Sequence, residues 1–304
     1  MDKRILAIFG LVFTTFIWGV SFEIVAESLK GIPPLLFSTI RFFIAFLLIF
    51  LVVIYRNFFY NELSITRSEL KAGLVCGSFL FLGYFFQKYG LWSNGLNLLG
   101  FDSSDPNKSA FITGTSVLMV PIILFFLGKV NQNIHLWISI IIVLLGLAIL
   151  LNPNVEQFTM GDLLTFGCSI SFAIHIVLQG KYIIRDLNIY NFFMVQIAWV
   201  TVLCFFGCLL ELNFINIQLV WSSKVWLGLS ITGVLATFIG ILIMVWAQRI
   251  VSPIQTAVIF TLEPVFAGLY NHLFTQYKLS QLGILAGLII VVGILYHELK
   301  AEHV

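Results

Sequence analysis

The chain has 304 residues, of which 60% are hydrophobic and 10% are charged, and its formal net charge at pH 7 is +2. Its mean hydropathy is +1.04, whereas a soluble domain usually carries about a quarter charged residues. These values exclude a soluble globular protein, and so small a charge gives no reason to expect a nucleic-acid partner. An all-α integral membrane protein, surrounded by membrane lipid, is predicted.

Apolar windows of about 20 residues, the length that crosses a bilayer core of roughly 30 Å, can be laid along nearly the whole chain. We predict ten transmembrane helices, with ends that are defined to within a few residues. In chain order they are Ile5 to Val25, Pro34 to Tyr55, Leu70 to Trp92, Ser109 to Leu127, Leu136 to Leu151, Asp162 to Ile183, Asn191 to Leu210, Val225 to Ala247, Ile254 to Phe274 and Leu282 to Tyr296. The connecting loops are short, so neighbouring helices must run antiparallel.

The lysines and arginines at the ends of these spans and between them predict the orientation, because cytoplasmic loops hold the excess of such residues. With the N-terminus in the cytoplasm, ten of them fall on the cytoplasmic side: Lys3, Arg4, Arg56, Arg67, Lys71, Lys129, Lys181, Arg185, Arg249 and Lys300. Four fall on the other side: Lys30, Lys108, Lys224 and Lys278. Both termini are therefore predicted to be cytoplasmic. The first span lacks a small-residue cleavage pattern after it, so we expect a retained helix and not a signal peptide.

The two halves of the chain share faint similarities in the same order. Gly146, Pro121 and Arg41 in the first half match Gly293, Pro264 and Gln196 in the second, at offsets of 147, 143 and 155 residues. Five spans in each half would invert the second copy in the membrane, a construction typical of secondary transporters. Residues 1–152 and 153–304 are therefore predicted to be two inverted five-helix repeats of one membrane domain.

The ninth span contains a glutamate beside a proline, Glu263 and Pro264, near its middle. A charge at the centre of a span costs at least about 2.5 to 3.5 kcal/mol, so it is expected to face a cavity or a partner. Pro264 lacks a backbone N–H and pushes against the preceding turn, which predicts a broken helix. Two interpretations remain open: Glu263 contacts a substrate, or it braces the break by a hydrogen bond to a neighbouring helix.

Three more charged residues, Glu23, Arg41 and Lys88, are expected at similar depth in the outer third of the first three spans. We expect them to neutralise one another and to hold an outer gate shut in one state. The alternatives are that Arg41 or Lys88 captures a substrate carboxylate, or that Lys88 reaches along its stem to the membrane interface.

Polar and aromatic side chains complete the predicted cavity lining. Tyr84 and Gln87 share a helix face at a spacing of three residues, as do His175 and Gln179 at four. Trp18 and Trp246, with Phe172, would form an aromatic wall suited to apolar groups or cations. His175 is either a proton shuttle or a hydrogen-bonded packing residue. The predicted substrate-binding residues are Trp18, Tyr84, Gln87, Thr113, His175, Gln179, Trp246 and Glu263.

No cofactor or metal is predicted. Cys204 and Cys208 share a helix face, but they have no histidine or carboxylate partner in the pattern of a metal site, and we interpret them as packing residues. A membrane-embedded enzyme that acts on a lipid or small metabolite is the alternative function. It would need a nucleophile with a base or a metal set, and the sequence contains neither HExxH nor GxSxG.

Several segments in matching helices together resemble the EamA family of the drug/metabolite transporter superfamily. They are Trp18-Gly19-Val20-Ser21-Phe22, the segment from Pro33 to Arg41, Ser109-Ala110-Phe111-Ile112-Thr113-Gly114 with Pro121, Gly161-Asp162-Leu163-Leu164 and Leu262-Glu263-Pro264. One departure is the loop from Ser93 to Lys108, which is longer than usual.

This resemblance implies ten helices in two inverted repeats around a central cavity, with cytoplasmic termini. It also implies secondary transport, often export, of amino acids, amines or related small metabolites across the inner (cytoplasmic) membrane. We expect a monomer, with a dimer through Gly283 and Gly287 of the tenth span as the alternative.

Overall fold

The computed structural model describes residues 2–60, 64–104, 106–128, 134–152, 158–184, 187–214, 219–274 and 280–301. The regular structure of these residues is helical. In chain order the elements are α1 (Lys3–Ser28), α2 (Pro34–Tyr60), α3 (Arg67–Leu91), α4 (Ser93–Leu98), α5 (Pro106–Gly114), α6 (Ser116–Phe126), α7 (Ile134–Leu151), α8 (Met160–Ile183), α9 (Ile189–Phe214), α10 (Ser223–Ser230), η1 (Ile231–Ile239), α11 (Gly240–Ala247), α12 (Pro253–Phe260), α13 (Glu263–Phe274) and α14 (Gln281–Ala301).

Ten segments of the described residues are long and apolar enough to cross a membrane. They confirm the ten predicted spans, and no end differs from its prediction by more than four residues; the second span, for example, extends to Phe59 and the tenth to Lys300. Seven spans are single helices, namely α1, α2, α3, α7, α8, α9 and α14. The ninth span combines α12 with α13. The fourth span combines α5 with α6, and the eighth combines α10, η1 and α11.

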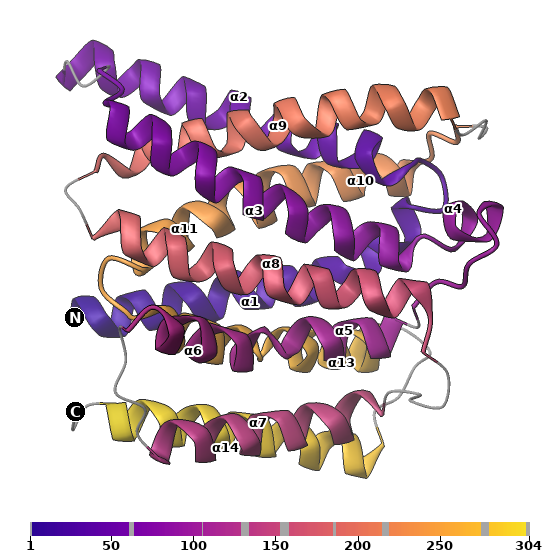
Figure 1. Ribbon diagram of the computed structural model, residues 1–304, viewed down its shortest axis with the longest axis vertical. Coiled ribbons are helices and arrows are strands. Elements are labelled where there is room, and N and C mark those ends of the chain that lie inside the picture. The colour runs from indigo at the N-terminus through magenta and orange to yellow at the C-terminus, as the bar shows by residue number, and fades with distance from the viewer. Residues whose placement is uncertain are drawn as a thin grey trace.

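The long helices run alongside one another, and α1 begins at the same end of the bundle as α14 ends (Figure 1). We call this the termini end and the opposite end, where α1 finishes, the mouth end. The helices of the two halves interleave, because α3 packs against α8 and α9, and α1 packs against α11 and α13. The chain therefore forms one continuous bundle, with the α7–α14 pair along one side and the α2–α9 pair along the other (Figure 1).

Two of the ten spans are broken near their middle. In the ninth span α12 ends at Phe260 and α13 begins at Glu263, which confirms the break expected beside Pro264. In the fourth span α5 and α6 are separated at Thr115. The two breaks are built alike: the hydroxyl of Thr115 donates to the carbonyl of Ile112, and that of Thr261 to Val258, each at 2.6 Å.

The long loop between the third and fourth spans is fastened to the start of α8. The backbone N–H of Ser104 donates to the carbonyl of Gly90 at 2.8 Å, and the N–H of Gly161 donates to that of Asp102 at 3.0 Å. The fully buried carboxylate of Asp162 accepts hydrogen bonds from the Ser104 hydroxyl and from the Lys108 ammonium, both at 2.6 Å. Asp162 therefore anchors this loop at the mouth end.

Candidate functional site

A cavity of about 680 Å³ extends from the mouth end of the bundle to just beyond its middle. Its walls come from α1, α2, α3, α5, α8, α11 and the region of the break between α12 and α13. Glu23 and Lys30, both exposed, lie at its opening. The volume falls within the range of small-molecule binding sites.

Most of the residues singled out from the sequence lie in the wall of this cavity. Those that line it are Trp18, Glu23, Arg41, Tyr84, Gln87, Lys88, Thr113, His175 and Glu263. The other two, Gln179 and Trp246, do not line it. Trp246 instead packs on α1, where a Cβ added at Gly10 would lie 3.7 Å from its ring.

Glu263 is the first residue of α13 and lines the cavity directly after the helix break. None of the described residues forms a hydrogen bond or ion pair with its carboxylate. This geometry favours exposure to the cavity over the alternative in which Glu263 braces the break. His175, by contrast, both lines the cavity and lies 2.8 Å from the side-chain amide nitrogen of Gln196.

The backbone of α1 touches the break at Gly19. A Cβ added at Gly19 would lie 2.6 Å from the carbonyl oxygen of Glu263 and 2.9 Å from the Cβ of Phe266. Only a glycine permits so close an approach of the two backbones. This contact between α1 and the start of α13 therefore fixes the position of Glu263 in the cavity wall.

Replacing Gly19 by alanine is expected to lower the free energy of unfolding by about 1 to 3 kcal/mol, because the added methyl group overpacks a contact made of backbone atoms. The matched control is Gly287→Ala on α14, where the new Cβ would meet only Val265 Cγ1 at 3.6 Å. The control should be neutral or slightly more stable, because alanine favours the helix. Unfolding of the purified protein in detergent measures both, and equal stability of the two variants would contradict the assignment.

Arg41 and Lys88 lie in one wall of the cavity and are only 4% and 2% exposed. Arg41 Nε donates to the Thr237 hydroxyl at 2.7 Å, and one terminal nitrogen donates to the Tyr84 hydroxyl at 3.1 Å. Lys88 Nζ donates to the Ser38 hydroxyl at 2.6 Å and lies 4.7 Å from the centroid of the Phe37 ring. Neutral groups thus hold both cations in place.

The expected mutual neutralisation of Glu23 with Arg41 and Lys88 is not formed in this conformation. Glu23 is exposed at the opening of the cavity, and within the described ranges it makes no ion pair with either cation. The reason is depth: the side chains of Arg41 and Lys88 extend into the interior, whereas Glu23 remains at the rim.

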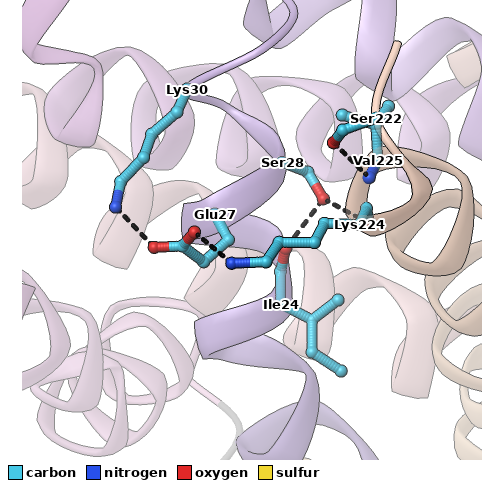
Figure 2. Close-up of polar contacts among 7 residues, drawn as sticks. All are labelled: Ile24, Glu27, Ser28, Lys30, Ser222, Lys224 and Val225. Atoms are coloured by element: carbon cyan, nitrogen blue, oxygen red, sulfur yellow. Dashed lines mark hydrogen bonds and ion pairs between the residues drawn. The ribbon is translucent and has the colours of Figure 1, made fainter.

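The ion pairs of the opening are made by Glu27, one turn after Glu23. Figure 2 shows its carboxylate between the ammonium groups of Lys30 and Lys224, the latter at 3.3 Å. Hydrogen bonds from these two lysines hold the pKa of Glu27 below its usual range. Such exposed pairs contribute little to stability, at most about 1 kcal/mol, but they join the end of α1 to the start of α10.

Below the cavity, toward the termini end, buried polar side chains close the bundle. The amide of Gln179 donates to the side-chain oxygen of Gln248 at 2.8 Å, and the Gln248 amide donates to the carbonyl of Ile176 at 3.1 Å. Nearer the termini, Glu298 pairs with Arg4 at 3.2 Å and accepts from Gln255 at 3.0 Å. Gln179 shares a helix face with His175 as predicted, but it lies one turn deeper and belongs to this closure.

Sequence reasoning missed several residues of the site. Asn271 lines the cavity and follows Glu263 by eight residues, so two turns of helical periodicity would have found it. Thr237 carried no such signal, because it belongs to η1, a π-helix whose longer period changes which side chains face inward. The indole N–H of Trp18 donates to the carbonyl of Ala236 in the same segment, at 2.8 Å.

Comparison with known proteins supports the fold and shows a family to which the second half of the chain is similar. Residues 159–297 match the EamA-like transporter family. A protein of Archaeoglobus fulgidus named "Uncharacterized transporter" is 29% identical over 273 residues, which cover 88% of this chain and 78% of that protein. The "Uncharacterized transporter YoaV" of Bacillus subtilis is 24% identical over 293 residues, 94% of each chain.

A crystal structure titled only "Crystal structure of protein" superposes with a TM-score of 0.74 and covers 96% of both chains at 17% identity, a level that shows the fold alone. The ten apolar helices, this shared fold, the family match and the relatives named as transporters agree with one another. The chain is a multi-pass membrane protein that is similar to the EamA-like transporter family over residues 159–297 and to two proteins named as transporters over most of its length.

Proposed function

We propose that the protein is a secondary transporter that exports or exchanges small polar metabolites, such as amino acids or related amines, by alternating access. The observation that carries this proposal is the cavity of about 680 Å³, which among the described residues reaches the middle of the bundle from the mouth end. Its far side is closed by the Gln179–Gln248 hydrogen bond and the pairs around Glu298. This arrangement matches one of the two states that alternating access requires.

The moving parts in this proposal are two inverted repeats, residues 1–152 and 153–304. The contacts between helices support these repeats. In two repeats of five spans, a contact between two helices should recur between the helices five spans away from each of them. Three contacts recur in this way: α3–α8 as α1–α11, α3–α9 as α2–η1, and α6–α8 as α1–α13. The two breaks support them as well, since Thr115 and Thr261 are 146 residues apart, close to the sequence offsets of 147 and 143. One copy of the chain encloses the whole cavity, so a monomer suffices.

We propose that the termini end lies in the cytoplasm and that the mouth end faces away from it across the inner (cytoplasmic) membrane, which the charge count supports. Among the counted cations, Lys129, Arg185 and Lys278 lie outside the described residues. Substrate would leave through the mouth in the state described here.

Counterflow in liposomes tests the transporter proposal. Purified protein is reconstituted, the vesicles are loaded with one unlabelled compound from a panel of amino acids, amines and organic acids, and uptake of the same labelled compound is followed. We expect transient accumulation of at least one compound, recovered chemically unchanged. Chemical conversion without accumulation would favour the alternative, an enzyme acting on a lipid or small metabolite, and the absence of counterflow for the whole panel would contradict the proposal.

A further inference from the structure

The wall formed by α2 and α3 concentrates positive charge in the cavity. Arg41 and Lys88 both line it, and both lie near the ring of Tyr84, whose centroid is 4.6 Å from the guanidinium carbon and 5.6 Å from the ammonium nitrogen. The two cations are more than nine-tenths buried. Burying a charge is costly unless a counter-charge or strong hydrogen bonds offset the loss of water.

No carboxylate among the described residues forms an ion pair with either cation. Glu211 on α9 contacts the start of α2, the helix that carries Arg41. Its oxygens accept from the Tyr89 hydroxyl at 2.6 Å and from the N–H of Leu35 at 3.0 Å, at the start of α2. Glu211 is thus held at the start of α2, and it pairs with neither Arg41 nor Lys88.

Both cations also retain unused hydrogen-bond donors. A guanidinium carries five N–H groups and an ammonium three, whereas Arg41 makes one bond each to Thr237 and Tyr84, and Lys88 makes one to Ser38. Paired donors on two neighbouring cations suit the oxygen atoms of a carboxylate or phosphate group. The remaining wall is largely apolar, with Phe172 and Phe260 among its residues.

From this geometry we propose that Arg41 and Lys88 form an anion subsite that takes the carboxylate or phosphate group of the transported molecule, whose apolar part lies against the aromatic wall. This proposal rests on the proposed transport function and narrows its substrates. Molecules with an anionic group are accepted, and simple amines are repelled by the two cations. Glu263, on α13, lines the same cavity, but its carboxylate forms an ion pair with neither cation.

Calorimetric titration of the purified protein in detergent tests the subsite with four compounds that share an aromatic ring. 3-Phenylpropionate and phenylalanine carry a carboxylate, phenyl phosphate carries a phosphate, and phenethylamine carries no anion. Wild type is expected to bind at least one of the first three and not the amine, and the preferred compound distinguishes carboxylate from phosphate. In Lys88→Met the affinity for that compound should fall at least about tenfold, the loss of one charge-assisted hydrogen bond.

Two matched variants separate recognition from folding. Lys88→Arg restores a cation and should recover most of the binding, whereas Lys224→Met removes an exposed cation outside the cavity lining and should leave the affinity unchanged. Lys88→Met itself should unfold at the same temperature as wild type or higher, because it removes a buried charge that lacks a carboxylate partner.

Binding of phenethylamine as tightly as of the acids, binding of none of the three anions to wild type, or undiminished affinity in a folded Lys88→Met would each overturn the subsite. Counterflow of an amine in the liposome experiment would still support transport in that case. Failure of the subsite and failure of the transporter proposal are therefore distinguishable.

Discussion

Replacing Asp162 by alanine is expected to lower the free energy of unfolding by about 3 to 5 kcal/mol, the range observed when one partner of a buried ion pair is removed. The Asp162 side chain is fully buried, and its partner Lys108 is 9% exposed. The same carboxylate also accepts from the Ser104 hydroxyl at 2.6 Å and from the N–H of Thr159 at 2.8 Å, where it closes the capping box of α8. The substitution would remove all three contacts, and two of them, with Ser104 and Lys108, hold the loop that follows α3.

Asp162→Asn separates the ionic contribution from the hydrogen bonds, because its amide oxygen can still accept from the N–H of Thr159 while its NH2 group can donate to the Ser104 hydroxyl oxygen. We expect it to be less destabilised than Asp162→Ala. If the pair with Lys108 is the main contribution, the double variant Asp162→Asn/Lys108→Met should lose less stability than the sum of the two single variants. Equilibrium unfolding in mixed detergent micelles measures the free energy of unfolding of the wild type, Asp162→Ala, Asp162→Asn, Lys108→Met and the double variant. A loss below about 1 kcal/mol in Asp162→Ala would contradict the anchoring role.

The spans were predictable because their length is set by the membrane and not by tertiary contacts. A run of about 20 apolar residues has few alternatives to a membrane-spanning helix, and all ten predicted spans are present in the described residues. The break at Glu263 was predictable for a similarly local reason, the missing N–H of Pro264. The break at Thr115 was not, since Pro121 lies inside the continuous helix α6 and marks no interruption there.

The cavity lining was predictable where a polar or charged side chain was too costly to face lipid, as for Arg41, Lys88 and Glu263. Helical periodicity gave the facing direction but not the depth at which the cavity ends, so Gln179 was assigned to the lining although it lies in the closure beneath it. The pairing of Glu23 with the cations was inferred from similar depth along three helices. Similar depth cannot show which way a long side chain extends, and here Glu23 stays at the opening.

Glu263→Gln is expected to reduce counterflow by about ten- to a hundredfold, which corresponds to the loss of one interaction with a charged group. The carboxylate lines the cavity at the break of the ninth span, and none of the described residues pairs with it. A carboxylate that lines the cavity without a partner is suited either to contact the substrate or to couple binding to movement of the halves. Both roles need the negative charge, which glutamine lacks at nearly the same size.

The same substitution should leave folding intact, because it removes a charge that is costly in a membrane span and breaks no contact with the described residues. The unfolding free energy is expected to stay within about 1 kcal/mol of wild type or to rise. Glu27→Gln is the matched control: it removes an equal charge at the opening, where Glu27 pairs with lysines but does not line the cavity (Figure 2). Full counterflow in a folded Glu263→Gln would show that the charge serves neither substrate recognition nor coupling. A loss of transport in Glu263→Gln, with normal transport in Glu27→Gln, would show that transport depends on the carboxylate at the break of the ninth span.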